Sequence, residues 1–535
     1  MTYLNRQRQK VIITSPEISK KTNISVGGNY YFSLIIDENV VKICFPLCSA
    51  SMLQCFGISG LINGSEGMKP GWVNNHFSNG EIEIIIPPDR PGFFISKKGK
   101  FSVASSESRV FWPIVHKVMS FRSPWNVNPA FYSEVAGKLP AIAFTDAESG
   151  TIITIGDIPD RSVLLGISMK REGIDRLRYE TDKFLQRLNT YGEAESIKAN
   201  ALLSIFLSNS KCIDTSGNCI LASKSPYYYV SAGYWARDFV FWVLPVLEKI
   251  DPYRAKELIA EILTKYWTNK GVHALYLDGR ILYNGFELDQ LAYHFLVLSR
   301  SVKYGIISSQ KAVNLSRELT LLLENFKSDR FQLYRTDLNS SDDPVEYPYV
   351  TYSNVALWYS IRYFSESIDN QNREDLLAVA EEIKRDVNSC MVKEGMYVYS
   401  NDLKEHYNFY DDPTGSLLLL PYLGFIRRSD IVFKKTAKWI SSNKNEYYIS
   451  GKYGGVGNMH VKHPWLHSFY SMMLSSLSNS SLLEQLPMNY GLACETIDEN
   501  NGECLTGIHF PGSSGMYVQA ILKTLGYDRA FKSQR

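Results

Sequence analysis

The N-terminal part of the chain alternates between short apolar runs and clusters of turn-forming residues. Runs such as YYFSLIID, VVKICFPL, EIEIIIPP and finally VLLGISM at 163–169 are separated by clusters such as NGSEG, PPDRPG and DAESG. Alternating apolar and polar positions, interrupted by turns at spacings of roughly ten residues, are typical of antiparallel strands in a β-sandwich. We therefore predict an antiparallel β-sandwich domain over residues 1–175.

After this region the apolar positions take up the spacing of helices. The segment REGIDRLRYETDKFLQRL switches first, and it predicts a helical linker over residues 176–192. Beyond it lie about twelve candidate helices, some amphipathic, such as AKELIAEIL, and others apolar on nearly all sides, such as VFWVLPVL. An outer shell of amphipathic helices around a ring of buried ones produces this mixture. We therefore predict a multidomain β plus all-α protein whose residues 193–535 form an (α/α)6 six-hairpin barrel.

Composition excludes several classes of partner. The chain has 535 residues and a net charge of +2 without basic runs, so neither nucleic acid nor an anionic membrane is expected as a partner. Its 34 Tyr, 26 Phe and 9 Trp suit stacking on sugar rings, but they are explained more simply as core residues. The N-terminus lacks a signal-like apolar region and no later run has membrane-spanning length, so we expect a cytoplasmic protein.

Neither the cysteines nor the histidines have the spacing of a metal site. Cys44, Cys48 and Cys55 lack a nearby histidine or a second cysteine pair, so we expect the 8 cysteines to be free and mostly buried thiols. The histidines of segment 460–467 do not have the spacing of a zinc motif either. We therefore predict that the protein uses no metal and no cofactor.

Polar residues suited to catalysis gather in loops that lie beside apolar helices. Loops that flank the inner helices of such a barrel converge on one end, so we expect these residues to share one pocket. The stretches are GYWARDF (233–239), YNGFELDQLAYHF (283–295), NSSDDPVEYPYVTYSN (339–354), FYDDPTGSLLLLPYLGF (409–425) and a tail with GKYGGVGNMHVKHPW (451–465) and ETIDENNGECLTG (495–507).

The same stretches, in the same order, resemble glycoside hydrolase family 125, the metal-independent exo-α-1,6-mannosidases. GYWARDFVFWVLPVL is similar to the family's Trp-x-Arg-Asp segment and the apolar helix after it, and FELDQLAYHF is similar to its Glu-x-Asp-x-Leu helix start. SSDDPVEYPYVTYSNVALW resembles its Ser-Asp-Asp segment, YDDPTGSLLLLPYLGF its Leu-Pro-Tyr-Leu-Gly run, and GVGNMHVKHPW its Gly and His loop. The resemblance covers roughly residues 225–530. It implies an inverting hydrolase that acts on an oligosaccharide or glycoside without a metal.

The resemblance also implies where the general acid and the general base lie. The acid falls in the Ser-Asp-Asp segment, at Asp343 or Asp342, and the base falls in the last loop, at Glu495. Inversion requires two such carboxyl groups about 6.5–9.5 Å apart, one protonating the leaving oxygen and one activating water. A carboxyl beside a second carboxyl has a raised pKa, which suits an acid near neutral pH. We favour Asp343 over Asp342 as the acid, and Glu503 is the second choice for the base.

Other polar residues of these loops are candidates for sugar contacts. Arg237 and Asp238 either grip hydroxyls of the terminal sugar or form an internal pair that caps a helix. Glu287 and Asp289 lie two residues apart at a helix start, so at most one is expected to point into the pocket. The predicted substrate-binding residues are Trp235, Arg237, Asp238, Glu287, Asp289, Asn354, Asp411, Asp412, His463 and Trp465.

Two features of the sequence keep other functions open. The residues after the Arg-Asp pair are large and apolar, and the Glu495 loop has the sequence Glu-Thr-Ile-Asp, which is closer to glucoamylase-like enzymes. A glucoamylase-type α-glucosidase on the same scaffold is therefore the first alternative. A non-hydrolytic carbohydrate-binding or epimerase-like barrel is the second, and it predicts that Asp343 and Glu495 do not face one pocket. The oligomeric state stays open.

Overall fold

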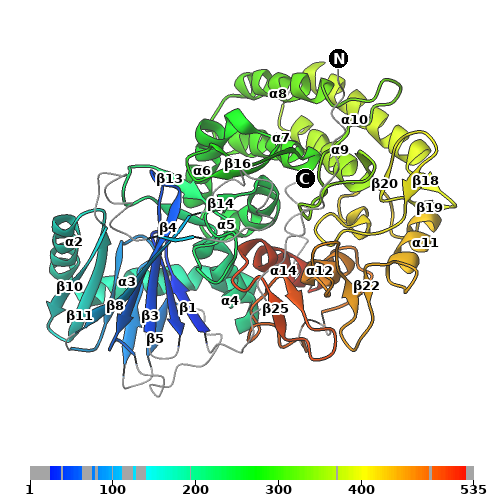
Figure 1. Cartoon of the computed structure of the whole chain (residues 1–535). Helices are drawn as coiled ribbons and strands as arrows, with labels where there is room; N and C mark the ends of the chain where they lie inside the picture. Colours follow the sequence, from blue (N-terminus) through cyan, green and yellow to red (C-terminus); the bar gives the residue numbers. More distant parts are fainter. Residues whose placement is uncertain are drawn as a thin grey trace, which may run out of the picture.

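A computed structural model of the chain places strands in the N-terminal region and mostly helices after it. Figure 1 shows the two sheets, in blue and cyan, packed beside a larger helical part that runs from green to red. The structure describes residues 24–37, 40–62, 75–78, 82–98, 101–110, 125–127, 140–192, 194–368, 371–480, 483 and 485–525.

Two antiparallel sheets pack against each other in the N-terminal region. Side chains from both meet in one apolar core, where the rings of Phe32 and Phe93 lie 5.8 Å apart. The first sheet has the order β1 (Ile24–Gly28), β2 (Ser33–Asp37), β3 (Val40–Leu47), β4 (Met52–Ser59), β8 (Ser102–Val110), β9 (Trp125–Val127). The second has the order β10 (Ala141–Ala147), β11 (Gly150–Gly156), β7 (Gly92–Ile95), β6 (Glu83–Ile85), β5 (His76–Ser78).

The prediction of a strand at 163–169 is wrong, because this segment lies in helix α2 (Pro159–Glu172). The helix packs on strands β10 and β11 of the second sheet. Its buried face includes Gly166 and Met169, at helical spacing. A Cβ at Gly166 would lie 2.2 Å from Oγ1 of Thr145 in β10, so only glycine permits this close approach of helix and sheet.

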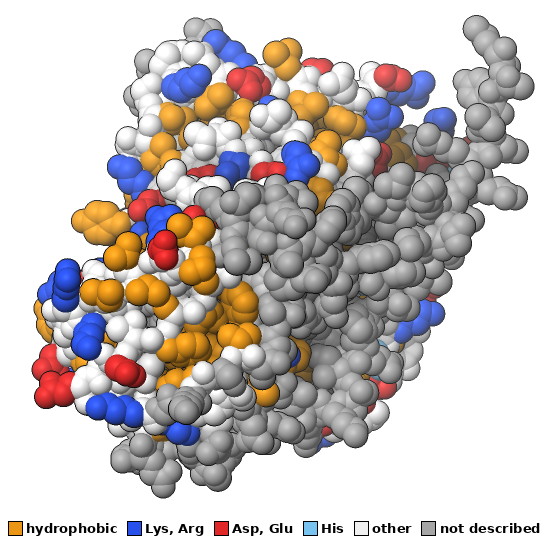
Figure 2. Space-filling view, turned by 60° about the vertical axis from the view of Figure 1, so that its left-hand side comes forward, with side chains coloured by type: hydrophobic (Ala, Val, Ile, Leu, Met, Phe, Trp, Pro, Cys, Tyr) orange, Lys and Arg blue, Asp and Glu red, His pale blue; other side chains and the backbone are white. Residues whose placement is uncertain are grey.

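Apolar side chains also reach the surface of this region. Val163 and Leu164 of α2 are exposed, as are Val103 and Phe144 of the two sheets. Figure 2 shows apolar side chains grouped on one face of the molecule, next to segments drawn in grey. The exposed apolar residues of α2 explain the wrong prediction, because they form an apolar run that does not mark the buried face of the helix.

The helical part contains helices of both predicted kinds. Those buried on nearly all sides are α7, α9, α12 and α14, whereas α6, α8 and α11 bury one face. The elements are α3 (Ile174–Leu185), η1 (Gln186–Tyr191), α4 (Glu195–Leu207), η2 (Arg237–Val243), α5 (Leu244–Ile250), α6 (Pro252–Glu261), α7 (Leu288–Lys303), α8 (Ser309–Glu324), α9 (Thr351–Ser365), α10 (Gln371–Cys390), η5 (Leu417–Leu419), α11 (Ile431–Ile440), α12 (Leu466–Leu474) and α14 (Pro511–Thr524).

The buried helices are neighbours in space, and outer helices pack on α7 and α9. Helix α14 contacts α12 and η2, η2 contacts α7, and α7 contacts α9. The ring of Trp358 in α9 lies 5.1 Å from that of Phe425, which follows η5, and η5 in turn contacts α12. On the outside, α6 packs on α5, α8 on α7, and α10 on α9. Among the described residues, no helix combines the length and the apolar composition needed to cross a membrane.

Four cysteines form disulfides, which corrects the expectation of free thiols for these residues. Cys44 and Cys55 lie opposite each other on the adjacent strands β3 and β4. Cys48 pairs with Cys212, 164 residues away, and so joins the first sheet to the helical part. The sequence did not indicate this pairing because the fold brings these cysteines together over a long separation. The cytoplasmic location, which rested on the lack of a signal-like region, stays a prediction.

Hydrogen bonds also join the first sheet to the segment before η2. Lys224 is fully buried, and its Nζ donates to the carbonyl of Asn29 at 2.5 Å. The hydroxyl of Ser33 donates to the carbonyl of Lys224 at 2.5 Å, and Lys42 Nζ donates to the hydroxyl of Tyr227 at 2.9 Å. The sheet therefore fixes the segment around residues 224–229 on one side, and the other side of this segment faces the site described below.

Candidate active site

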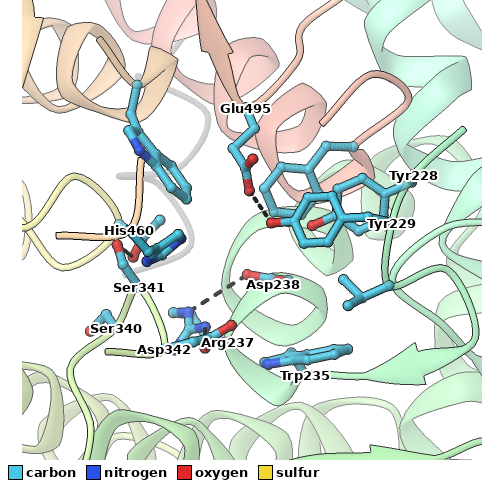
Figure 3. A pocket seen from close by; sticks show the side chains of 14 residues that line it. Tyr228, Tyr229, Trp235, Arg237, Asp238, Ser340, Ser341, Asp342, His460 and Glu495 are labelled. Atoms are coloured by element: carbon cyan, nitrogen blue, oxygen red, sulfur yellow. Dashed lines mark hydrogen bonds and ion pairs between the residues drawn. The ribbon is translucent and has the colours of Figure 1, made fainter. Parts of the chain in front are cut away.

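A cavity lies where the N-terminal ends of the buried helices meet. Helix η2 begins at Arg237, α12 follows Trp465 and α14 follows Phe510. Figure 3 shows Glu495 entering from one side, with Asp342 and Arg237 on the opposite side. The lining residues are Tyr228, Tyr229, Val230, Trp235, Arg237, Asp238, Ser340, Ser341, Asp342, Thr414, His460, Trp465, Glu495 and Phe510.

Arg237 holds a group of carboxylates together at the base of the cavity. Its guanidinium is buried and donates to Glu287 at 2.8 Å and to Asp342 at 2.9 Å. Asp289 and Asp238 lie 3.6 Å from it. Because one guanidinium faces four carboxylates among the described residues, it cannot neutralise them all. The group therefore retains negative charge or holds a proton.

The pKa values of this group agree with a retained proton. Burial raises the pKa of Asp238 to about 7 against the opposing effect of Arg237, and the nearby carboxylates of Asp342 and Glu287 raise it further. Burial also raises the pKa of Glu287, although His273, which is hydrogen-bonded to Glu287, opposes the change. Nδ1 of His273 lies 3.7 Å from Asp342 as well. Proton sharing within this group is thus possible near neutral pH.

Glu287 and Asp289 both approach Arg237. Glu287 precedes α7 with extended backbone angles, φ −117° and ψ 118°. The extended residue turns its side chain to the same guanidinium as Asp289, which lies in the first turn. Neither residue lines the cavity directly, so both act from behind Arg237.

Asp342 and Asp343 point to different partners, and only Asp342 lines the cavity. The backbone of Asp342 is left-handed, with φ 69°, a conformation that aspartate tolerates better than most residues. The side-chain oxygen of Asn339 fixes this turn by accepting from the N–H groups of Ser341 at 3.0 Å and Asp343 at 2.9 Å. Asp343 is buried and lies 2.9 Å from Nδ1 of His460. The geometry therefore reverses the preference for Asp343.

Glu495 is buried and accepts hydrogen bonds on both carboxylate oxygens. The hydroxyl of Tyr229 donates to Oε1 at 2.5 Å, and that of Thr506 donates to Oε2 at 2.8 Å. Burial raises the pKa of Glu495, and the two hydroxyl donors partly offset this by stabilising the carboxylate. A Cβ at Gly507, whose φ is 63°, would lie 2.4 Å from Cβ of Glu495, so this position requires glycine. Glu503, the second choice for the base, does not line the cavity.

His460 is a lining residue that the sequence did not single out as functional. Burial works against its charge, but the hydrogen bond and the negative charge of Asp343 outweigh it and raise the pKa of His460. Glu495 and Asp342 add to this effect. The segment around it drew notice only for its zinc-like histidines. The signal that would have revealed His460 is the aspartate that it pairs with, 117 residues away.

Asp411 and Asp412 support the site from behind and do not line it. Asp411 accepts from Ser416 at 2.6 Å and from the N–H of Leu417 at 2.8 Å, so it caps η5. Burial raises its pKa to about 8. Asp412 accepts from the N–H of Ser341 at 3.0 Å and from the hydroxyl of Tyr399 at 2.9 Å, and so anchors the Asp342 loop. Burial raises the pKa of Asp412 to about 6.

Two other predicted residues also lie outside the cavity, whereas both tryptophans line it. Asn354 is buried and bonds the backbone of Tyr334, with its side-chain oxygen 2.8 Å from the Tyr334 nitrogen. His463 lies 3.1 Å from Glu499 in a partly exposed loop. The indole nitrogens of Trp235 and Trp465 have no hydrogen-bond partner within the described part of the chain. Both rings line the cavity, where an aromatic face suits contact with a sugar ring.

A histidine and two carboxylates approach the geometry of a cation site. Ligand atoms of His273, Glu287 and Asp342 lie within 4.8 Å of one another. The guanidinium of Arg237, however, already bonds both Glu287 and Asp342. A cation placed there would meet this fixed positive charge. The donor set is thus better explained as the partner of Arg237.

The segment that holds this site matches the model of a known protein family. Residues 323–522 match the model described as metal-independent alpha-mannosidase, glycoside hydrolase family 125. This segment is similar to family 125. It contains both Asp342 and Glu495, and it begins in α8 and ends in α14. The match bears out the suspected family for this segment, which contains Asp343 as well as Asp342 and Glu495, the acidic residues named for the acid and the base.

A relative at the level of sequence is the meiotically up-regulated gene 157 protein of Schizosaccharomyces pombe. It is 26% identical over 213 residues, which are 36% of this chain and 42% of that protein. The match therefore spans less than half of the relative's length.

Two solved structures share the fold. A metal-independent alpha mannosidase of Streptococcus pneumoniae, in a non-productive complex with alpha-1,6-mannobiose, has a TM-score of 0.53 at 18% identity and covers 66% of this chain and 99% of its own. A bacterial glucoamylase complexed with acarbose has a TM-score of 0.55 at 10% identity and covers 95% of this chain and 86% of its own. The first likeness covers two thirds of the chain, whereas the second extends over nearly all of it. The chain therefore shares its fold, with mixed strand and helix content, with these two structures.

Proposed function

We propose that the protein is an exo-acting, inverting α-mannosidase that cleaves α-1,6-linked mannosides without a metal. Asp342 is the general acid and Glu495 the general base. The observation that carries this proposal is that both carboxylates line one cavity although they lie 153 residues apart in the sequence. The match of residues 323–522 to the model of metal-independent alpha-mannosidases supports the reaction. The complex of the Streptococcus pneumoniae protein with alpha-1,6-mannobiose supports the substrate.

Asp342 suits the acid because its surroundings can hold a proton. It belongs to the carboxylate group around Arg237, in which four carboxylates share one guanidinium among the described residues. A proton kept in such a group can pass to the oxygen of the leaving sugar. Asp343 instead pairs with His460 and holds its imidazole toward the cavity. We therefore give Asp343 a positioning role.

Glu495 suits the base because two hydroxyl donors stabilise its ionised form. Tyr229 and Thr506 each occupy one carboxylate oxygen, which fixes the orientation of the group. Its pKa, raised by burial, keeps it basic enough to take a proton from water. In the inverting reaction Glu495 removes that proton while the water attacks the sugar from the face opposite the leaving group.

The remaining lining residues suit the binding of one terminal sugar. The cavity holds about 420 Å³ of unfilled space, its mouth included. Trp235 and Trp465 offer ring faces, and Arg237, Asp238 and His460 offer charged groups to sugar hydroxyls. We further propose the scaffold in full: a β-sandwich over residues 1–175, a linker over 176–192 and an (α/α)6 barrel over 193–535.

The test compares three isosteric variants on α-1,6-mannobiose. Asp342→Asn and Glu495→Gln are each expected to lose at least about a hundredfold in kcat, and Asp343→Asn is expected to lose less. Proton NMR of the first product then shows whether β-mannose forms, as inversion requires. Full activity in both Asp342→Asn and Glu495→Gln would contradict the proposal, as would α-mannose as the first product.

The second candidate is a glucoamylase-type α-glucosidase. The likeness to the bacterial glucoamylase extends over 95% of the chain, including the N-terminal sheets. Parallel assays with α-1,6- and α-1,4-linked mannosides and glucosides decide between the two sugars. Binding of either sugar without any turnover would favour the non-hydrolytic alternative instead.

A further inference from the structure

A second and larger cavity lies at the opposite, C-terminal end of the buried helices. It holds about 1760 Å³ of unfilled space, its mouth included, against about 420 Å³ for the cavity around Glu495. Its floor is apolar, with Phe241, Leu296 and Leu522, and the rings of Tyr359 and Tyr363 form part of its wall. No step of the proposed hydrolysis uses these residues.

The charge of this second cavity is strongly positive. Among the described residues that line it, the basic side chains are Arg300, Lys303, Arg427, Arg428 and Lys523, whereas Glu248 is the acidic one. Nε of Arg300 lies 3.0 Å from Glu248, so this carboxylate is already engaged. With Lys303, Arg427, Arg428 and Lys523 as the other four cations, the described lining carries a net positive charge.

Arg300 has a donor group that points to a ligand. Its side chain is 9% exposed, and its Nη1 has no hydrogen-bond partner within the described residues. A buried guanidinium nitrogen without an acceptor is costly, because a donor removed from water loses its hydrogen bonds. If the cavity binds a ligand that carries an acceptor, Nη1 of Arg300 gains its hydrogen bond when the ligand is bound.

The plainer explanation is that these cations complement helix dipoles. Arg300 and Lys303 lie in the last turn of α7, and Lys523 lies in the last turn of α14. Arg428 donates to the carbonyl of Ser476, after α12, at 3.4 Å. This explanation does not account for Arg427, which lies in the loop after η5. It also does not explain why Nη1 of Arg300 has no hydrogen-bond partner among the described residues.

We propose that this cavity binds a small phosphate monoester. Arg300 grips the phosphate with its planar donors, Arg427 and Lys303 add positive charge around it, and the organic part rests on the aromatic wall. A doubly charged anion matches a surplus of several cations better than a single carboxylate does. From Asp289 to Arg300 helix α7 advances 11 residues, or about 16 Å, so the ligand lies away from the hydrolytic site.

Isothermal titration of the full chain with phenyl phosphate, inorganic phosphate and phenol tests the site. Phenyl phosphate is expected to bind saturably, inorganic phosphate more weakly and phenol not measurably, since both the charge and the ring contribute. Arg300→Gln should weaken phenyl phosphate binding at least about tenfold, and Arg427→Gln about threefold. The matched control is Arg330→Gln, an exposed arginine outside the cavity lining, which should bind as the unchanged protein does.

Three outcomes would overturn the proposal. They are no saturable binding of phenyl phosphate up to about 10 mM, equal weakening by Arg330→Gln, and unchanged binding in both cavity variants. Circular dichroism shows whether Arg300→Gln folds, because this variant leaves Glu248 without its partner. If it does not fold, Arg427→Gln and Lys303→Gln decide, since both residues are exposed and their replacement leaves the buried ion pair intact.

Discussion

The two ends of the buried helices carry opposite charge and different space. At the N-terminal ends, carboxylates crowd around Arg237 in a small cavity, whereas at the C-terminal ends basic side chains surround a wide one. Each end has the charge that its helix dipoles favour, acidic at the N-termini and basic at the C-termini. The catalytic end goes further, because its buried carboxylates outnumber the cation that they share. That excess is what allows a proton to be stored there.

The largest effect is expected from the two carboxylates of the acidic end. Asp342→Asn and Glu495→Gln should each lower kcat/KM by at least about a hundredfold, since each removes one proton transfer of the reaction. Asp343→Asn should cost about tenfold, because it acts through the orientation of His460. Steady-state kinetics on α-1,6-mannobiose measures all three. A larger loss in Asp343→Asn than in Asp342→Asn would reverse the assignment of the acid.

Replacing Arg237 at one end and Arg300 at the other compares how much each arginine contributes to the free energy of unfolding. Arg237→Gln should lower the free energy of unfolding by about 3–5 kcal/mol, because it leaves several buried carboxylates without their cation. Arg300→Gln should cost about 1–2 kcal/mol, since it leaves only Glu248 with a missing partner. Urea unfolding at one pH gives both values. Equal losses would show that the carboxylates around Arg237 are already largely neutral.

The carboxylates of the acidic end should also make stability depend on pH. The pKa of Asp411 is raised to about 8 in the folded protein, above its usual value of 3.8. The folded state therefore holds this proton while the unfolded chain releases it, so stability is lost as pH rises from about 4 to 8. Asp411→Asn should gain at least about 1 kcal/mol relative to the unchanged protein between pH 5 and pH 8. Urea unfolding at both pH values measures it, and a constant difference would contradict it.

Removing one donor to the base should shift the pH profile by a smaller amount. Tyr229→Phe deletes the hydroxyl that stabilises the carboxylate of Glu495, so the pKa of Glu495 should rise further. The acidic limb of the kcat/KM profile should then move up by about half to one pH unit. Tyr253→Phe, at a tyrosine that is 81% exposed, is the control. An unmoved acidic limb in Tyr229→Phe would mean that another group sets it.

The smallest effect is expected from the basic end on hydrolysis. Arg427→Gln should leave kcat/KM on α-1,6-mannobiose within about twofold of the unchanged protein, because distant sites without shared partners act independently. The same assay in the presence of phenyl phosphate extends the comparison. A marked change in either measurement would show that the two ends are coupled through the helices.

Much of the site could be predicted from sequence because its residues lie in loops next to apolar helices. Trp235 and Arg237 come from one stretch and Asp342, Trp465 and Glu495 from segments much later in the chain, and the structure places all five in one cavity. Hydrophobic patterning revealed the helices, and the loops between them could therefore be expected to converge. The same patterning misplaced α2, where apolar residues are exposed and a glycine marks the buried face.

The finer assignments could not be predicted, because contacts across long separations decide them. Whether Asp342 or Asp343 faces the cavity depends on the turn that Asn339 fixes and on His460, 117 residues beyond Asp343. Asp412, expected on the sugar, instead anchors Ser341. The residues next to each aspartate in the sequence do not indicate which distant residue it will contact. The disulfide between Cys48 and Cys212 was missed for the same reason.

The contact between the first sheet and the segment before η2 has a consequence for the proposed base. Tyr229 donates a hydrogen bond to Glu495 and lies two residues after Tyr227. The hydroxyl of Tyr227 accepts a hydrogen bond from Lys42 of strand β3, 185 residues away in the sequence. Lys224 in the same segment is bonded to Asn29. The proton affinity of the base is thus a joint property of both parts of the chain. Sequence change in the sheet alone can alter the pH at which the enzyme works, with every residue of the cavity left as it is.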